Sequence, residues 1–266
     1  MTVLRRYLRD NRRSLTGWAL GMLGLVAFTV AFYPSVKGQA SFEKVMEDLP
    51  DPVKAIIGAR EGVPITSPPG YLHGRLFSVV APVLLLTFGI GLGARAIGGS
   101  EDDGTLELLL GNPVSRRRVL VERFASVVLV LTAVGAALCG SLLLLAPFVG
   151  LLDGVSAPRV VGACLAATCL ALLHGTVAFT VGAATGRSAP AVAVATSLAT
   201  AGYLVEGVAA ITGGLDALRA ASPWHWYLDR NVLVEGLAAP AVGLPIVFSA
   251  VLLGAAAWAF TRRDLR

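Results

Sequence analysis

Charged residues are scarce in this chain. Only 15% of its 266 residues are Asp, Glu, Lys or Arg, whereas 55% are hydrophobic, and the mean hydropathy is +0.73. Soluble domains carry about 25% charged residues. The composition therefore excludes an ordinary soluble domain and indicates a chain that lies largely in hydrocarbon.

Lysine is almost absent, occurring only at Lys37, Lys44 and Lys54. A P-loop needs a lysine directly after its glycines to reach the nucleotide phosphates. The one glycine-containing stretch that resembles such a loop, Gly182 to Ser188, has the wrong spacing and no lysine. We therefore expect no ATP hydrolysis by this chain and no cofactor bound to it.

Cysteine and histidine are equally rare, with three of each. The cysteines fall in apolar runs without metal-ligand spacing and are expected to be small packing residues: Cys139, Cys164 and Cys169. The histidines are far apart, which argues against a membrane enzyme or a metal site. The basic residues flank apolar runs and do not form one face of a domain, so nucleic-acid binding is also excluded.

Six apolar runs are long enough to cross a bilayer, which takes about 20 residues. They cover 15–34, 74–97, 124–149, 158–185, 190–212 and 241–261. Each must be helical because lipid offers no partner to an unpaired backbone group. The sequence thus predicts an all-α polytopic membrane protein with a single transmembrane domain, 1–266. The spacings of Gly17 with Gly21 and of Gly89 with Gly93 predict close helix packing.

The basic residues set the expected orientation. With both termini in the cytoplasm, 14 of the 22 Lys and Arg lie on the cytoplasmic side and the other 8 are spread over longer outer loops. We expect a multi-pass protein of the inner (plasma) membrane with both termini cytoplasmic.

Three segments lie outside the spans. Residues 1–14 alternate apolar and arginine side chains at helical spacing, which predicts a basic amphipathic helix at the lipid headgroups. The alternative is a basic tail that only sets topology. Residues 35–73 form an extracytoplasmic loop, and residues 213–240, with Trp224 and Trp226, form an extracytoplasmic re-entrant or interfacial segment.

The cytoplasmic segment 98–123 carries a short predicted helix. Gly98-Gly99-Ser100 is expected to end the second span, and Asp102, Asp103 and Thr105 can cap the helix that follows. Its leucines share one face, with Glu107 opposite. Ser115 is the expected cap of the third span. The segment is either a docking element or a polar connector.

One motif favours docking. It comprises Glu101, Gly104, Thr105, Leu106, Glu107, Leu109, Leu110, Pro113, Val114, Ser115 and Arg116. This run closely resembles the type-2 (ABC-2 type) permeases of ATP-binding-cassette transporters. The resemblance extends over nearly the whole chain, including Ser222-Pro223-Trp224 before the sixth span.

The resemblance implies a coupling helix at about Thr105 to Leu110 that fits into an ATPase subunit. The implied coupling residues are Glu101, Asp102, Gly104, Thr105, Leu106, Glu107, Leu109 and Leu110. It further implies two copies of a separate ABC ATPase, which bind ATP and Mg, and a homodimer or heterodimer of permeases that acts as an exporter. The alternative, an ATP-independent carrier or channel, needs internal repeats, and 1–149 shows no similarity to 150–266.

Two ionisable residues fall inside the spans, where charge is costly. Glu206 and His174 are candidates for a translocation path. Glu206 alternatively pairs with Arg75 or Arg219. His174 alternatively stays neutral and bonds to a backbone carbonyl or a threonine.

Overall fold

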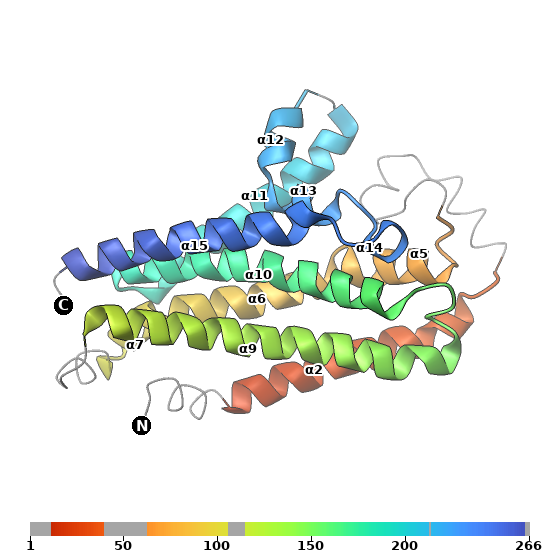
Figure 1. Cartoon of the computed structure of the whole chain (residues 1–266), viewed down its shortest axis with the longest axis horizontal. Helices are drawn as coiled ribbons and strands as arrows, with labels where there is room; N and C mark the ends of the chain where they lie inside the picture. The colour runs from red at the N-terminus through yellow and green to blue at the C-terminus, as the bar shows by residue number, and fades with distance from the viewer. Residues whose placement is uncertain (1–11, 40–62, 106–114, 213, 264–266) are drawn as a thin grey trace.

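The apolar runs of the sequence form helices in the computed structural model (Figure 1). The structure describes residues 12–39, 63–105, 115–212 and 214–263. The elements in chain order are α2 (Arg12–Phe32), η1 (Tyr33–Ser35), α5 (Pro68–Leu72), η2 (His73–Phe77), α6 (Val80–Ala94), η3 (Arg95–Gly99), α7 (Ser100–Asp102), α9 (Arg116–Leu145), η4 (Ala146–Val149), α10 (Ala157–Thr185), α11 (Ser188–Thr212), α12 (Asp216–Ala221), α13 (Pro223–Leu228), α14 (Val232–Glu235) and α15 (Ala239–Arg262). These ranges contain no strand.

Six helical stretches are long and apolar enough to cross a membrane. They are Ser14–Ser35, Pro68–Asp102, Arg116–Val149, Ala157–Thr185, Ser188–Ala209 and Ala239–Arg262. Each overlaps one expected span, so the expected fold class is confirmed. The third helix begins at the predicted cap, because Ser115 Oγ accepts a hydrogen bond from Arg118 N at 3.3 Å.

The start of α2 and the end of α15 lie at the same end of the bundle, as an even number of spans requires (Figure 1). This end, which also holds α7, the start of α9 and the α10–α11 corner, is called the Arg263 end. The opposite end holds α5, α13 and α14 and is called the Trp224 end. Segments 1–11 and 40–62, which include most of the expected amphipathic start and of the outer loop, lie outside the described residues.

Helix α10 forms the centre of the bundle. It packs against α6, α9, α11 and α15, and 72% of its apolar stretch is buried, compared with 17% for α11. Helix α2 packs against α9. Most of α11 therefore faces outward from a single chain.

Glycines set the distance between α6 and α10. A Cβ on Gly175 would lie 2.8 Å from the carbonyl oxygen of Gly89, and Gly93 faces the carbonyl of Gly175 in the same way. The two backbones therefore touch without intervening side chains. This confirms the packing predicted for Gly89 with Gly93. Gly17 and Gly21 show no such contact, because no atom from another element of the described residues lies within 4 Å of their Cβ positions.

The second span does not end at Gly98-Gly99-Ser100, as the sequence analysis expected. The helix continues through the π-helical turn η3 into α7 and ends at Asp102. The wide turn places Gly98 against the α10–α11 corner, where a Cβ would lie 2.7 Å from the carbonyl carbon of Arg187. The glycines thus permit a tertiary contact here and do not break the helix.

Candidate functional site

Half of the predicted coupling residues lie in or just after α7. Gly104 has a φ of 67° and follows the end of the helix, and Thr105 Oγ1 donates to the carbonyl oxygen of Ser100 at 3.0 Å. The remaining four predicted residues, Leu106, Glu107, Leu109 and Leu110, lie outside the described residues.

Glu101 faces the interior of the bundle. Its carboxylate pairs with Arg263, and the exposed fractions of the two side chains are 6% and 19%. Arg116 Nη1 also donates to the carbonyl oxygen of Arg263 at 2.7 Å. Gly186, with a φ of 70°, lies directly against the pair, because a Cβ there would be 2.5 Å from Glu101 Oε1. Helices α7, α9, α10 and α15 thus meet at one ion pair.

Asp102 is bound to the start of α11. Its Oδ2 accepts hydrogen bonds from Ser188 N at 2.9 Å and from Ser188 Oγ at 2.6 Å. A carboxylate in this place accepts from a backbone N–H that has no partner within the helix, and the positive end of the helix dipole stabilises its negative charge. The sequence analysis assigned Asp102 as a cap of the next helix along the chain. The structure shows it at the N-terminus of the fifth span, and the helix that it was expected to cap lies outside the described residues.

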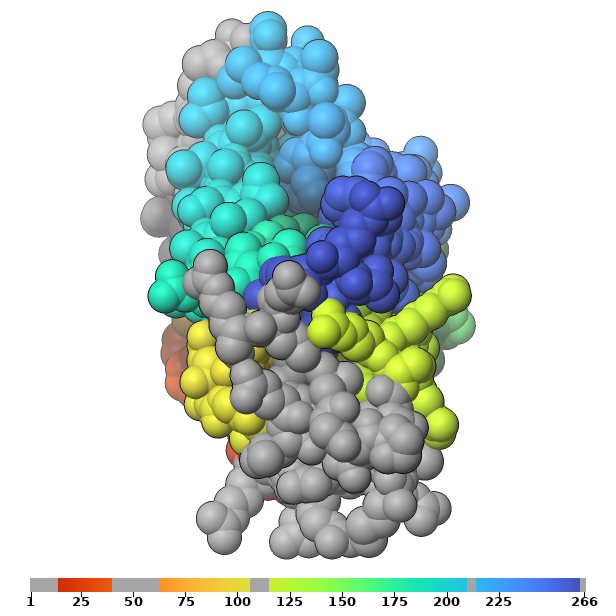
Figure 2. Space-filling view, turned by 90° about the vertical axis from the view of Figure 1, so that its left-hand side faces the viewer, coloured from red at the N-terminus to blue at the C-terminus, as the bar shows by residue number. Residues whose placement is uncertain are grey.

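These contacts define what we call the Arg263 junction: Glu101, Asp102, Arg116, Ser188 and Arg263. Figure 2 views this end, where the tip of α15 lies between the α10–α11 corner and the start of α9. The junction joins the ends of spans two, three, five and six directly.

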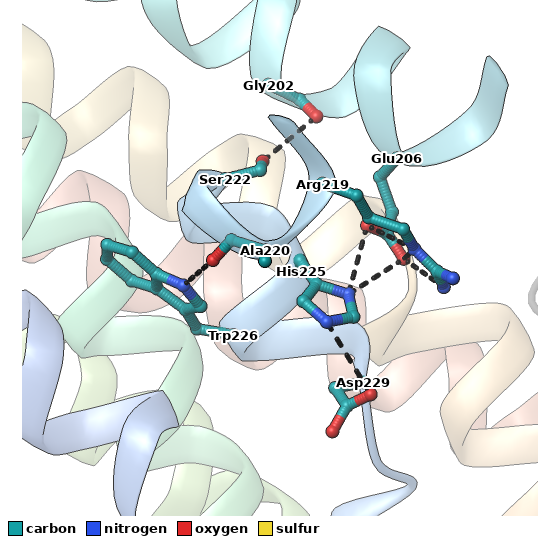
Figure 3. Close-up of polar contacts among 8 residues, drawn as sticks. All are labelled: Gly202, Glu206, Arg219, Ala220, Ser222, His225, Trp226 and Asp229. Carbon is teal, nitrogen blue, oxygen red and sulfur yellow. Dashed lines mark hydrogen bonds and ion pairs between the residues drawn. The ribbon is translucent and has the colours of Figure 1, made fainter. Parts of the chain in front are cut away.

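A second polar cluster lies at the Trp224 end (Figure 3). Glu206 on α11 has a side chain that is only 11% exposed. It accepts from Arg219 Nε at 3.2 Å at each carboxylate oxygen and from Arg219 Nη2 at 2.9 Å, and these bonds raise the pKa of Arg219. His225 Nδ1 is 3.3 Å from Glu206, and His225 Nε2 is 3.8 Å from Asp229. Glu206 therefore pairs with Arg219, one of its two expected partners, while the other, Arg75, lies over the ring of Phe32.

Helix α13 is fastened to the bundle on two sides. Trp224 Nε1 donates to the carbonyl oxygen of Ala199 on α11 at 2.8 Å. Tyr227 Oη donates to the carbonyl oxygen of Phe77 in η2 at 2.6 Å, and burial raises the pKa of the Tyr227 phenol well above its ordinary value. The segment that the sequence assigned to the interface thus forms short helices that hold the ends of spans two and five together.

A groove of about 360 Å³ lies between α6 and α11, and Trp224 contributes to its lining. Its lining is mostly apolar and includes four residues that carry a hydroxyl, Thr87, Thr196, Thr200 and Tyr203. The sequence analysis named none of these four lining residues. The available signal was the spacing of Thr196 and Thr200, which puts two hydroxyls on one face of a predicted span.

His174 lies in the core of the bundle. It is 3% exposed, its Nδ1 is 2.9 Å from the carbonyl oxygen of Leu170, and it does not line the groove. This geometry supports the structural alternative, a ring bonded to the backbone. Cys164 and Cys169 are buried and Cys139 is half-buried, all as free thiols. The described residues hold no group of three side chains suited to a metal ion.

A search of curated proteins found no match to the chain. A family model described as "ABC-2 family transporter protein" matches residues 1–265. That range takes in all six spans, the segment between α7 and α9, and both polar clusters. The chain therefore belongs to the ABC-2 transporter family and is a multi-pass membrane permease subunit of the ABC-transporter class, not itself a catalytic subunit.

Proposed function

We propose that this chain is the permease of an ABC exporter and that a separate ABC ATPase drives it through segment 98–123. Family membership across residues 1–265 is the observation that carries the proposal. The Gly-Thr-Leu-Glu run at residues 104–107 occupies the place of the coupling helix between spans two and three. Two ATPase copies bind ATP and Mg, and this chain supplies no group to hydrolysis.

Two permease chains, identical or related, form the path. The low burial of α11 in one chain supports a partner on that side. The groove between α6 and α11 presents Thr196 and Thr200 among apolar side chains, and hydroxyls in a span are best satisfied at a helix interface or a water-filled path. We assign this groove to the substrate path.

The distribution of basic residues supports a cytoplasmic Arg263 end and an outer Trp224 end in the inner membrane. ATP binding closes the ATPase pair, which displaces the coupling segment and switches the path between inward and outward access. Such a change is a rigid-body transition driven by differential binding of the two states.

Purification from the native host tests the proposal. A tagged chain, extracted from membranes and analysed by mass spectrometry, should carry a P-loop ATPase in equal copy number with the permease chains. An ATP-independent carrier or channel would be recovered without such a subunit, and that result would contradict the proposal.

Leu109→Asp should weaken ATPase association about tenfold, or roughly 1.4 kcal/mol. The physical reason is that a charge replaces an apolar side chain on the face assigned to the ATPase groove. Pull-down titration against purified ATPase measures the change. Leu109→Met is the matched control and should bind normally, because it conserves apolar volume. Normal binding by both variants would show that this face does not contact the ATPase.

Glu107→Arg tests the opposite side of the same helix. We expect Glu107→Arg to bind the ATPase more weakly than Glu107→Gln does. Glutamine only removes an attraction to a basic group on the ATPase, whereas arginine would also repel that group. The same pull-down titration applies, with membrane insertion followed in parallel.

A further inference from the structure

The two carboxylates at the head of the coupling segment are both bonded within the permease. The Glu101 side chain is 6% exposed and is paired with Arg263. Asp102 uses one oxygen to hold both donors of Ser188, at 2.9 and 2.6 Å. Asp102 itself lies at the surface, so its bonds to Ser188, and not burial, distinguish it from a carboxylate held free for a partner.

The contacts of Asp102 lead to the fifth span. Ser188 is the first residue of α11, and the backbone just before it, at Arg187, lies against Gly98. The second span and the start of α11 are thus in backbone contact and are pinned by two hydrogen bonds. Because interiors are close-packed and resist continuous deformation, a displacement of α7 must carry the start of α11 with it.

The contacts of Glu101 lead to the sixth span and back to the third. Arg263, directly after α15, is held by Glu101 from α7, and its carbonyl oxygen is held by Arg116 from α9 at 2.7 Å. Residues on both sides of segment 106–114 are therefore tied to the same end of α15.

We propose that Glu101 and Asp102 are transmission residues. They position spans five and six so that movement of the coupling segment reaches the groove, and they do not form the ATPase contact. This inference rests on the proposed function, because it assumes an ATPase that moves the segment.

The test separates binding, hydrolysis and movement. In a chain whose native cysteines are replaced by alanine, a single cysteine at Thr200 reports groove exposure by its rate of reaction with a charged maleimide. The complex with its ATPase, in nanodiscs, is compared without nucleotide and with ATP plus vanadate. With the junction intact, we expect nucleotide to change the rate.

Asp102→Ala should bind the ATPase and hydrolyse ATP while the nucleotide-dependent change at Thr200 falls at least roughly fivefold. Asp102→Asn keeps an acceptor oxygen for Ser188 N and should retain most of the response. The adjacent exposed residue supplies the matched control, Asp103→Ala, which should respond fully.

Two results would overturn the inference. A full response in Asp102→Ala would show that the Ser188 contact does not transmit movement, and loss of ATPase binding would make Asp102 a docking residue. If Asp102→Ala lowers the yield of folded protein, the charge swap Glu101→Arg with Arg263→Glu provides a second test. The swap should restore the response lost in Glu101→Gln, and failure to restore it counts against transmission. Absence of any co-purified ATPase would instead refute the proposed function.

Discussion

Gly93→Val is expected to destabilise the protein by about 3 kcal/mol, because the added side chain would occupy the position of the Gly175 backbone on α10. Neither backbone can move without separating the two helices that pack most extensively in the bundle. The thermal midpoint in detergent should fall by roughly 10 °C. The measurement is thermal unfolding followed by circular dichroism or by loss of the monodisperse peak in size-exclusion chromatography.

Gly91→Val is the matched control. It lies two residues away on the same helix, and among the described residues no atom of another helix lies within 4 Å of its Cβ position. Both variants change helix propensity equally, so the difference between them reports the α6–α10 contact alone. Equal thermal midpoints for Gly93→Val and Gly91→Val would show that the close approach is not needed for the fold.

Arg219→Ala is expected to loosen the packing of α12 and of the start of α13 on α11, at a cost of about 2 kcal/mol. Removal of the guanidinium leaves the Glu206 carboxylate, whose side chain is 11% exposed, without its principal partner. This expected free-energy cost is smaller than that for a fully buried ion pair, because the Arg219 side chain is 35% exposed. Hydrogen exchange of residues 216–228, read by mass spectrometry, should quicken with little change in α10.

Comparison with three variants identifies the cause. Arg219→Lys should restore only part of the protection, since an ammonium cannot form the paired contact of a guanidinium. The double variant Glu206→Ala with Arg219→Ala should be less destabilised than Arg219→Ala alone, because no unpaired charge remains. Arg230→Ala removes a 57% exposed arginine that is 4.0 Å from Asp229 and should change exchange little. Equal exchange in Arg219→Ala and Arg230→Ala would contradict the assigned role of Glu206.

The number and character of the spans were predictable because they depend on local sequence. A run of about 20 apolar residues has one stable arrangement in lipid, whatever surrounds it. The cap at Ser115 was equally local, since its acceptor and donor are three residues apart. The end of the second span was not predictable from Gly98 and Gly99. Two adjacent glycines weaken an isolated helix. In this fold the helix continues through them because a neighbouring backbone packs closely against Gly98.

The partner of Glu206 shows how far sequence reasoning reaches in the site. Because a charge within a membrane span is costly, the sequence predicted that the Glu206 carboxylate pairs with a cation. The two candidates were Arg75 and Arg219. The choice between them required the fold, because α12 turns back over α11 and brings Arg219 into contact while Arg75 stays on the ring of Phe32.

The local sequence alone determined the six helices and, through their even number, that both ends of the chain lie at one end of the bundle. The motif between spans two and three came from the resemblance to the family. Tertiary structure alone decided what the acidic residues of that motif do. Asp102 reaches across 86 residues to Ser188, and Glu101 reaches across 162 residues to Arg263. Patterns of three or four residues describe contacts within one helix, whereas hydrogen bonds between distant helices depend on how close-packed side chains fix the whole bundle.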